Sequence, residues 1–407
     1  MSSSPWLSRS RRALVALAGV LVALAATAAQ KAWVGNFKDD TVSVIDTTSG
    51  SVVATVPVAK GPHGMAVGAS GSPLYVSSDG ASVVNLIDTA SDKLTGTIEV
   101  GRSPHGLALA PDGRVLLVGV YGEDRVAFVD TASRAVVATA PVAKPHTIAI
   151  RPDGKLAYVS SQQPGAFALV VIDLASRSVV KTIPLEKPPR DLEFTWDGKT
   201  LLFTLAGTDA VQVLDAASDQ VTTTIPTGAS PHIAMQARGA PFGTVVIQGP
   251  GELMLFDPAT KKPVRSIAVG KQPHWMAPAD GGKTFYVSNE GSNDVTVVDL
   301  ASGKTKTIAV GNAPRKVVVQ TGDGAAGTKV SIANFAFTPA ELVVAAKTTV
   351  TWSNDDGAPH AIAFADGRTG TDLLLPGARH ARTFDAPGVY GYVCSVHPYM
   401  SGRVVVR

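Results

Sequence analysis

The sequence predicts an all-β protein, in which a seven-bladed β-propeller is followed by a small Greek-key β-sandwich. Three observations lead to this fold class. Glycine and proline are frequent, with 39 and 27 residues, and only 6% of residues are aromatic, which is typical of many short strands joined by tight turns. A repeat of about 42 residues fills most of the chain, and the composition changes after it. A chain of 407 residues also exceeds the size at which one core keeps growing, so at least two domains are expected.

The N-terminus has the pattern of an export signal. Arg9, Arg11 and Arg12 precede an uncharged apolar run over residues 13–29 that ends in small side chains. This pattern predicts a signal peptide over residues 1–29 and a periplasmic protein. The arginine pair leaves two export routes open, a twin-arginine signal and an ordinary secretory signal. The small-residue end favours cleavage over an uncleaved anchor, and no other stretch is apolar enough to span, so no stable membrane span is expected after cleavage.

Two sequence markers define the repeat. An aspartate follows an apolar strand every 42 or 43 residues, at Asp46, Asp88, Asp130, Asp173, Asp215, Asp257 and Asp299. Because each is followed closely by Ser or Thr, we expect these aspartates to cap turns rather than to catalyse. A proline followed by His or Arg recurs in the same register, and the second residues of these pairs are His63, His105, His146, Arg190, His232, His274 and Arg315.

Each unit reads as four short strands, and a four-stranded unit of this length is typical of a propeller blade. The chain offers three strands before Pro62 and one after Pro314, so the last strand is expected to complete the first blade and close the ring over residues 30–320. Segments such as LYVSSDG, FYVSNEG and VTVVDLASG resemble the YVTN family of seven-bladed propellers. This resemblance is specific for the fold and not for a function.

A glycine-rich linker over residues 321–328 and a separate β-domain over residues 329–407 are expected after the repeat. The strand candidates of this domain are VSIANF, ELVVAA, TTVTWSN, HAIAF, ARTFDA, VYGYVC and GRVVVR. His380 lies between two of the turns, and we expect it to be a solvated loop residue.

The single cysteine of the chain belongs to a set of soft donors. Cys394, His397 and Met400 lie in one short loop, and His360, in TWSNDDGAPHAIAF, is placed to supply a fourth donor from an earlier strand. Thiolate, imidazole and thioether are the donors of a trigonal copper site with a weak axial ligand. The alternatives for Cys394 are a buried core thiol and an intermolecular disulfide. Neither alternative predicts a histidine three residues later and a methionine six residues later.

The loop Cys-x-x-His-Pro-x-Met resembles that of the cupredoxins, and of amicyanin in particular, and the approach PGVYGYVC follows the same family pattern. The resemblance implies one type 1 copper per chain, with His360, Cys394 and His397 in the plane and Met400 axial. It also implies electron transfer with a redox protein, such as a cytochrome c or a periplasmic dehydrogenase. Val393 and Ser395 flank the cysteine, so the histidine bridge of the multicopper oxidases is missing, and a binuclear copper centre would need a second cysteine.

The repeated histidines leave a second function open. We expect the seven Pro-His and Pro-Arg positions to ring one mouth of the channel, too far apart to share one ion, with the two arginines favouring an anion. The combination also resembles the architecture of nitrous oxide reductase, whose catalytic copper cluster lies in a histidine ring. We prefer an electron carrier as the function of this chain. The alternative is a redox enzyme with its active site in the funnel of the propeller channel. The net charge of +3 is spread without a basic stripe, so no nucleic acid partner is expected.

Overall fold

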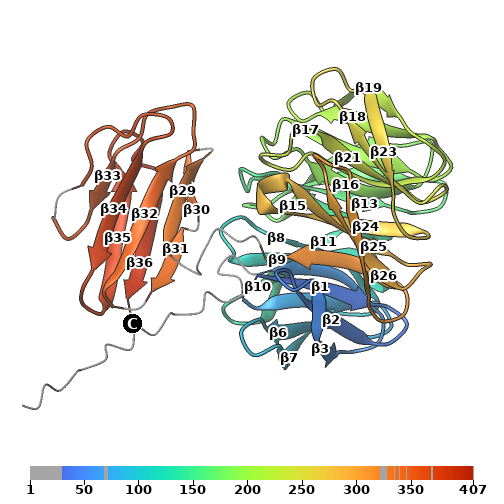
Figure 1. Ribbon diagram of the computed structural model, residues 1–407, viewed down its shortest axis with the longest axis horizontal. Helices are drawn as coiled ribbons and strands as arrows, with labels where there is room; N and C mark the ends of the chain where they lie inside the picture. The colour runs from blue at the N-terminus through green and yellow to red at the C-terminus, as the bar shows by residue number, and fades with distance from the viewer. Residues whose placement is uncertain are drawn as a thin grey trace, which may run out of the picture.

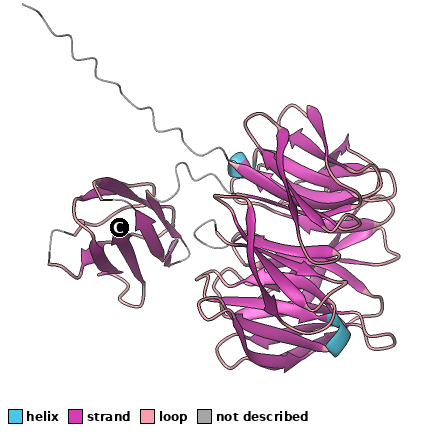
Figure 2. Ribbon diagram, turned by 90° about the horizontal axis from the view of Figure 1, so that it is seen from below, coloured by secondary structure: helices cyan, strands magenta, loops and turns pink. Residues whose placement is uncertain are grey.

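The computed structural model describes residues 30–67, 72–320, 328–333, 335–338, 340–344, 346–367 and 370–406. The expected signal peptide and nearly all of the expected linker lie outside these residues. The strands β1–β28 form one body and β29–β36 another, and strands dominate both (Figures 1 and 2). Of the helices within the described residues, none has the length and apolar character needed to cross a bilayer.

The first body is built from short strands of similar length. In chain order they are β1 (Lys31–Asn36), β2 (Thr41–Asp46), β3 (Ser51–Pro57), β4 (Pro62–Val67), β5 (Leu74–Ser78), β6 (Val83–Asp88), β7 (Lys93–Glu99), β8 (Pro104–Leu109), β9 (Val115–Val120), β10 (Arg125–Asp130), β11 (Ala135–Pro141), β12 (Pro145–Ile150), β13 (Leu156–Ser161), β14 (Ala168–Asp173), β15 (Ser178–Pro184), β16 (Pro189–Phe194), β17 (Thr200–Leu205), β18 (Ala210–Asp215), β19 (Gln220–Pro226), β20 (Pro231–Met235), β21 (Gly243–Ile247), β22 (Glu252–Phe256), β23 (Pro263–Ala268), β24 (Pro273–Ala279), β25 (Thr284–Asn289), β26 (Asp294–Asp299), β27 (Thr305–Ala309) and β28 (Pro314–Val319). Two single-turn 3-10 helices are described between them, η1 (Tyr121–Glu123) and η2 (Asp280–Gly282).

In the described residues these strands form seven four-stranded antiparallel sheets, which confirms the predicted seven-bladed propeller. Six sheets use consecutive strands, from β4-β5-β6-β7 to β24-β25-β26-β27. The seventh has the order β28-β1-β2-β3, so a strand from the end of the repeat completes the first blade, as expected. Val317 pairs with Val34, and Val318 pairs with Trp33. The ring is therefore closed by non-covalent pairing between its two ends.

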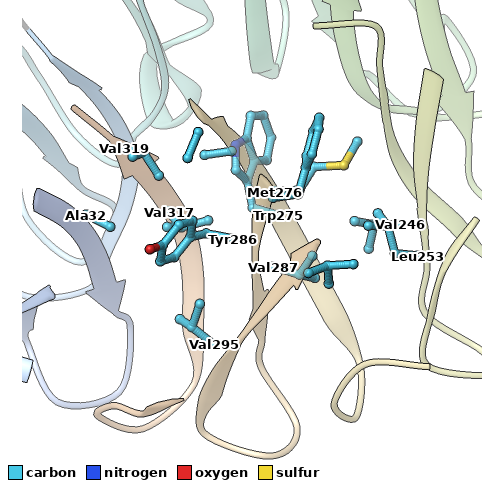
Figure 3. Close-up of a cluster of buried hydrophobic side chains, with 14 of the residues drawn as sticks. Ala32, Val246, Leu253, Trp275, Met276, Tyr286, Val287, Val295, Val317 and Val319 are labelled. Carbon is cyan, nitrogen blue, oxygen red and sulfur yellow. The ribbon is translucent and has the colours of Figure 1, made fainter. Parts of the chain in front are cut away.

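The last strand of each blade is the most exposed of its four strands. In the second blade, every residue of β5 is buried, whereas most residues of β7 are exposed. The inner strands are buried because neighbouring blades cover both of their faces, which explains their continuous apolar sequences. Figure 3 shows side chains from neighbouring sheets pointing into the space between them, with Val246, Met276, Val287 and Val317 in one buried cluster.

The repeated aspartates cap turns, as the sequence predicts. The Asp130 Oδ1 atom accepts hydrogen bonds from the Ser133 backbone N–H at 2.7 Å and from the Ser133 hydroxyl at 2.7 Å. The backbone N–H of the residue at +3 makes the same bond in the other turns at 2.7 to 2.9 Å. These bonds favour the charged carboxylate and lower the pKa of each aspartate. The residues are therefore structural.

The second body is a sandwich of two sheets. Its strands are β29 (Lys329–Ala333), β30 (Ala336–Thr338), β31 (Glu341–Val344), β32 (Thr348–Asn354), β33 (Ile362–Phe364), β34 (Arg379–Phe384), β35 (Gly388–Cys394) and β36 (Ser401–Val406). One sheet has the order β30-β29-β32-β34 and the other β31-β36-β35-β33. Trp352, Phe364, Phe384 and other buried side chains fill the space between the sheets.

Two expectations for this sandwich need correction. The short strand β30 has no counterpart among the strand candidates, because its three residues are too few to show an alternating pattern. His380 is not in a solvated loop but in β34, opposite Trp352. Its ring is partly buried against the Trp352 ring, with the centroids 6.0 Å apart, and burial lowers its pKa. The loop prediction failed because the turn residues near it end one residue before the strand.

Candidate metal centre

The backbone of His360 is fixed by hydrogen bonds to a neighbouring segment. It lies in the segment between β32 and β33 and forms an isolated antiparallel bridge with Leu374. The His360 N–H donates to the Leu374 carbonyl at 3.0 Å, and the Leu374 N–H donates to the His360 carbonyl at 2.6 Å. The Asn354 side chain also donates to the Leu374 carbonyl at 2.7 Å. His360 is fully buried, so these bonds fix the position of its ring.

Cys394, His397 and Met400 share the loop that joins β35 to β36. The Cys394 N–H donates to the Met400 carbonyl at 3.1 Å, and the Met400 N–H donates to the His397 carbonyl at 2.9 Å. The Ser395 N–H ties this loop to the segment of His360 through the Ala361 carbonyl at 3.0 Å. The side chains of Cys394 and Met400 are buried in the sandwich core, and His397 is half-buried. The loop is therefore closed on itself and fixed to the neighbouring segment.

The three donor atoms form a nearly equilateral triangle. The Cys394 Sγ atom lies 3.6 Å from His360 Nδ1 and 3.7 Å from His397 Nδ1, and the two Nδ1 atoms are 3.3 Å apart. A point equidistant from these atoms lies about 2 Å from each, which matches metal–nitrogen and metal–sulfur bond lengths. The residues therefore fit a mononuclear metal ion with a thiolate and two imidazoles in one plane. Met400 lies at the end of the same loop.

Two residues that the sequence analysis did not single out support this triangle. The Asp356 Oδ2 atom lies 3.1 Å from His360 Nε2, on the far side of the ring from the triangle. An N–H on Nε2 leaves Nδ1 as the lone pair that faces Sγ, a tautomer that suits metal binding. The same carboxylate accepts the Phe335 backbone N–H at 2.8 Å. The Phe335 ring stands edge-on to His397, with the centroids 4.9 Å apart at 90°.

The residues expected at the propeller mouth also lie close together. Each proline is the first residue of an inner strand, so its histidine is the second residue of that strand and does not precede it. The ring centroids of His63 and His105 are 3.7 Å apart, and those of His105 and His146 are 4.2 Å apart. His232 and His274 form a second pair at 4.2 Å, and His63 reaches His274 at 5.8 Å. The rings therefore contact one another more closely than expected, but among the described residues only His360, Cys394 and His397 bring three ligand atoms within 4.8 Å of one another.

The two arginines of this ring have partners of their own. Arg190 Nη1 donates to the Ser230 hydroxyl and to Gln248 Oε1, each at 3.0 Å. Arg315 Nη2 lies 3.4 Å from Glu290 Oε1, and its guanidinium covers the Phe37 ring at 3.6 Å. These contacts engage Nη1 of Arg190 and Nη2 of Arg315, whereas the buried Arg315 Nε has no hydrogen-bond partner.

Comparisons with known proteins agree with the geometry of the sandwich. The family model described as copper binding proteins, plastocyanin/azurin family, matches residues 325–407. Amicyanin-alpha of Methylorubrum extorquens is 39% identical over 88 residues, which are 20% of this chain and 74% of that protein. The chain belongs to the plastocyanin/azurin family through its C-terminal domain. Amicyanin of Paracoccus versutus is 31% identical to this cupredoxin domain and its neighbourhood over 107 residues, 25% of this chain and 74% of that protein.

The cupredoxin domain is thus a copper-binding electron-transfer domain, and type 1 copper is its cofactor. The model of a YNCE-like beta-propeller matches residues 8–112, a range that includes the first strands of the other body. Hydrazine synthase of Kuenenia stuttgartiensis has a TM-score of 0.61 at 21% identity, covering 66% of this chain and 92% of that chain. AztD of Citrobacter koseri, in its apo form, has a TM-score of 0.56 at 18% identity, covering 72% and 98%. At these identities the likeness shows the propeller fold alone.

Proposed function

We propose that the chain is an exported, periplasmic electron carrier with one type 1 copper. His360 and His397 would bind the ion through Nδ1 and Cys394 through Sγ, and the thioether of Met400 would be a weaker fourth ligand. The observation that supports this proposal is the triangle of the three donor atoms, with sides of 3.3 to 3.7 Å. When bound, copper supplies a one-electron couple between Cu(II) and Cu(I).

The chain's own contribution is to keep the donor geometry fixed. The bridge between His360 and Leu374 and the backbone bond between Cys394 and Met400 hold the ligands from both sides. A ligand set that is fixed by the fold needs little rearrangement when its charge changes. The buried thiol and the apolar core beneath it also keep water away from the site.

The exposed face around His397 supports a protein partner. Val396, Tyr399 and Phe335 are 42%, 71% and 41% exposed, and all three lie next to His397 in sequence or by ring contact. Exposed apolar side chains around a half-buried ligand suit a small, short-lived contact with a redox protein, such as a cytochrome c or a periplasmic dehydrogenase. We propose that the propeller serves as a docking or scaffold module for this exchange.

Metal content and the visible spectrum of the copper-treated protein test this proposal. We expect an intense thiolate-to-copper band in the visible range that reductant bleaches. Cys394→Ser should abolish the band, whereas His380→Gln, which alters the other histidine of the cupredoxin domain, should leave it intact. A colourless wild-type protein, or a band that survives in Cys394→Ser, would refute the assignment. Retention of copper without reversible bleaching would favour copper storage over electron transfer.

A further inference from the structure

Imidazoles from the inner strands of five blades contact one another in the propeller channel. They belong to the inner strands β4, β8, β12, β20 and β24, and the residues are His63, His105, His146, His232 and His274. His63, His105 and His232 are each only 8% exposed. His63 is central, because its ring lies within 6.3 Å, centroid to centroid, of His105, His146 and His274. The cupredoxin copper site uses none of these residues.

Two of these rings have a hydrogen-bond partner on Nδ1. His105 Nδ1 lies 3.0 Å from the His146 carbonyl, and His146 Nδ1 lies 3.3 Å from the Arg190 carbonyl. His232 Nδ1 lies 2.7 Å from the buried Asp191 Oδ2, but the two atoms are not aligned for a hydrogen bond. A carbonyl or carboxylate opposite Nδ1 retains the proton there and leaves Nε2 with its lone pair. Histidines that ligate metals are usually oriented by such acceptors.

The charge state of the ring suits a cation. Burial, followed by the neighbouring imidazoles, lowers the pKa of His63 well below its ordinary value, and burial does the same for His105 and His274. Neutral imidazole is the form that binds transition metals. The carboxylates of Asp191 and Glu290 lie at the ring, and Glu290 sits 3.4 Å from Arg315. The buried Lys316 also acts on His105, and its charge is opposed by Glu193 and Asp191.

We propose that the histidine ring at the mouth of the propeller channel binds one transition-metal ion of the zinc or copper class. His63, His105 and His146 are the ligands, because they form a continuous arc on three consecutive inner strands. Among the described residues, three ligand atoms lie within 4.8 Å of one another only at the cupredoxin site, so the nitrogens of His63, His105 and His146 do not yet converge. The arc must therefore close on the ion by rotation about side-chain torsions. Imidazole-rich sites prefer zinc, copper and nickel over the hard cations magnesium and calcium.

Zinc titration of the full chain tests this site when the copper ligands are silenced. In a Cys394→Ser/His397→Gln background, we expect one tightly held Zn²⁺ per chain by equilibrium dialysis and metal analysis, and a higher melting temperature of the propeller with zinc. Adding His63→Gln and His146→Gln should weaken zinc binding at least tenfold. Adding His380→Gln instead should leave it unchanged. Co²⁺ should give a visible spectrum with nitrogen and oxygen ligands and no thiolate band.

Three outcomes would overturn the proposal. These are no retained Zn²⁺ in the silenced background, equal zinc affinity with and without the channel substitutions, and stabilisation by inorganic phosphate in place of zinc. The last result would assign the ring to an anion. If the double channel substitution prevents folding, His63→Gln and His146→Gln are tested singly in the same assay, and each should weaken zinc binding. Because the copper ligands are absent throughout, the result is independent of the proposed electron-transfer function.

Discussion

At the scale of single residues, the cupredoxin site depends on a carboxylate that the ligand motif does not contain. Asp356 faces His360 Nε2 and also receives the Phe335 N–H, so one side chain orients a ligand and holds the ring that covers His397. The Asp356 side chain is only 13% exposed, so its charge is poorly screened by water. A buried negative charge beside the site stabilises the more positive oxidation state of a bound metal.

Asp356→Asn should therefore raise the reduction potential of the copper-loaded protein. A unit charge several ångströms away is worth about 1–2 kcal/mol at an effective dielectric of about 20, or on the order of 50 mV for a one-electron couple. Asp355→Asn removes the same charge from the neighbouring, more exposed position and should change the potential less. Spectroelectrochemical titration measures both. Equal shifts in the two variants would show that the contact with His360 has no specific effect.

The ligands could be predicted from the sequence because three of them share one loop at fixed spacing. The supporting residues could not be predicted in the same way. Phe335 reaches the site from β29 and β30 only through tertiary packing, and it has a positive φ of 56° that no sequence pattern signals. Asp356 lies only four residues before His360, but its role shows only when the loop is folded and its carboxylate faces His360 Nε2.

At the scale of elements, each blade ends its third strand in the same capped turn. The residue four positions after the aspartate has a left-handed backbone, as at Gly303 with φ of 74° and Arg177 with φ of 55°. The Gly303 N–H donates to the Asp299 carbonyl at 2.8 Å, so the turn is closed by the backbone as well as by the side chain. The repeat period made these turns predictable, because the same residues recur at the same spacing.

Gly303→Ala should destabilise the propeller by about 1 kcal/mol, because L-residues disfavour the left-handed region. An added Cβ would approach the Arg265 guanidinium no closer than 3.4 Å, so the cost is conformational rather than steric. Arg177→Gly, at the equivalent position, should change stability by less than about 0.5 kcal/mol, since the gain in the turn is offset by the flexibility of glycine in the unfolded chain. Urea unfolding compares the two. Equal effects would contradict the turn argument.

At the scale of the whole molecule, stability depends on how the ring closes and on what fills its channel. The pairing of β28 with β1 joins residues almost 290 positions apart, and the buried Val317 lies within this pairing. The channel contains neutral imidazoles together with Glu193, whose pKa is raised by burial to about 7. Ring closure could be predicted by counting strands in the sequence. The close packing of the channel histidines could not be predicted, because it depends on how far each side chain extends inward.

Val317→Asp should destabilise the propeller by at least about 3 kcal/mol, because it places an unpaired charge in the closing strand. Val264→Asp, at a half-exposed position of the outer strand β23, should change stability by about 0.5 kcal/mol or less. Thermal unfolding followed by circular dichroism measures the difference, and the copper band reports whether the cupredoxin domain stays folded. Similar melting temperatures for the two variants would show that the closing strand is dispensable.

The propeller should also lose stability as the pH falls from about 6.5 towards 5. The unfolded chain takes up protons on its histidines near pH 6.5, whereas His63, His105 and His274 stay neutral in the fold. Each contributes up to about 1.4 kcal/mol per pH unit in this window. Glu193 acts in the opposite direction, because its raised pKa favours proton uptake by the folded state below about pH 7.

Melting temperatures of the metal-free protein between pH 5 and pH 7.5 check this balance. We expect the three histidines with lowered pKa to outweigh the one carboxyl group with raised pKa. The melting temperature should therefore rise with increasing pH. His274→Gln should lower the number of protons taken up on unfolding by about one and so flatten the pH dependence. His380→Gln should flatten it less. A melting temperature that is independent of pH would mean that the channel histidines titrate as they do in the unfolded chain.

The position of β28 also has a consequence for synthesis. The first blade receives its inner strand only from residues 314–319, so a ribosome must translate more than three quarters of the chain before the ring can be completed. Until then, the open edge of β1 presents unpaired backbone groups beside the apolar side chains of Trp33 and Val34. The ring therefore stays open, with one unpaired strand edge, for most of the time that translation takes, and an unpaired edge of this kind favours aggregation until β28 covers it.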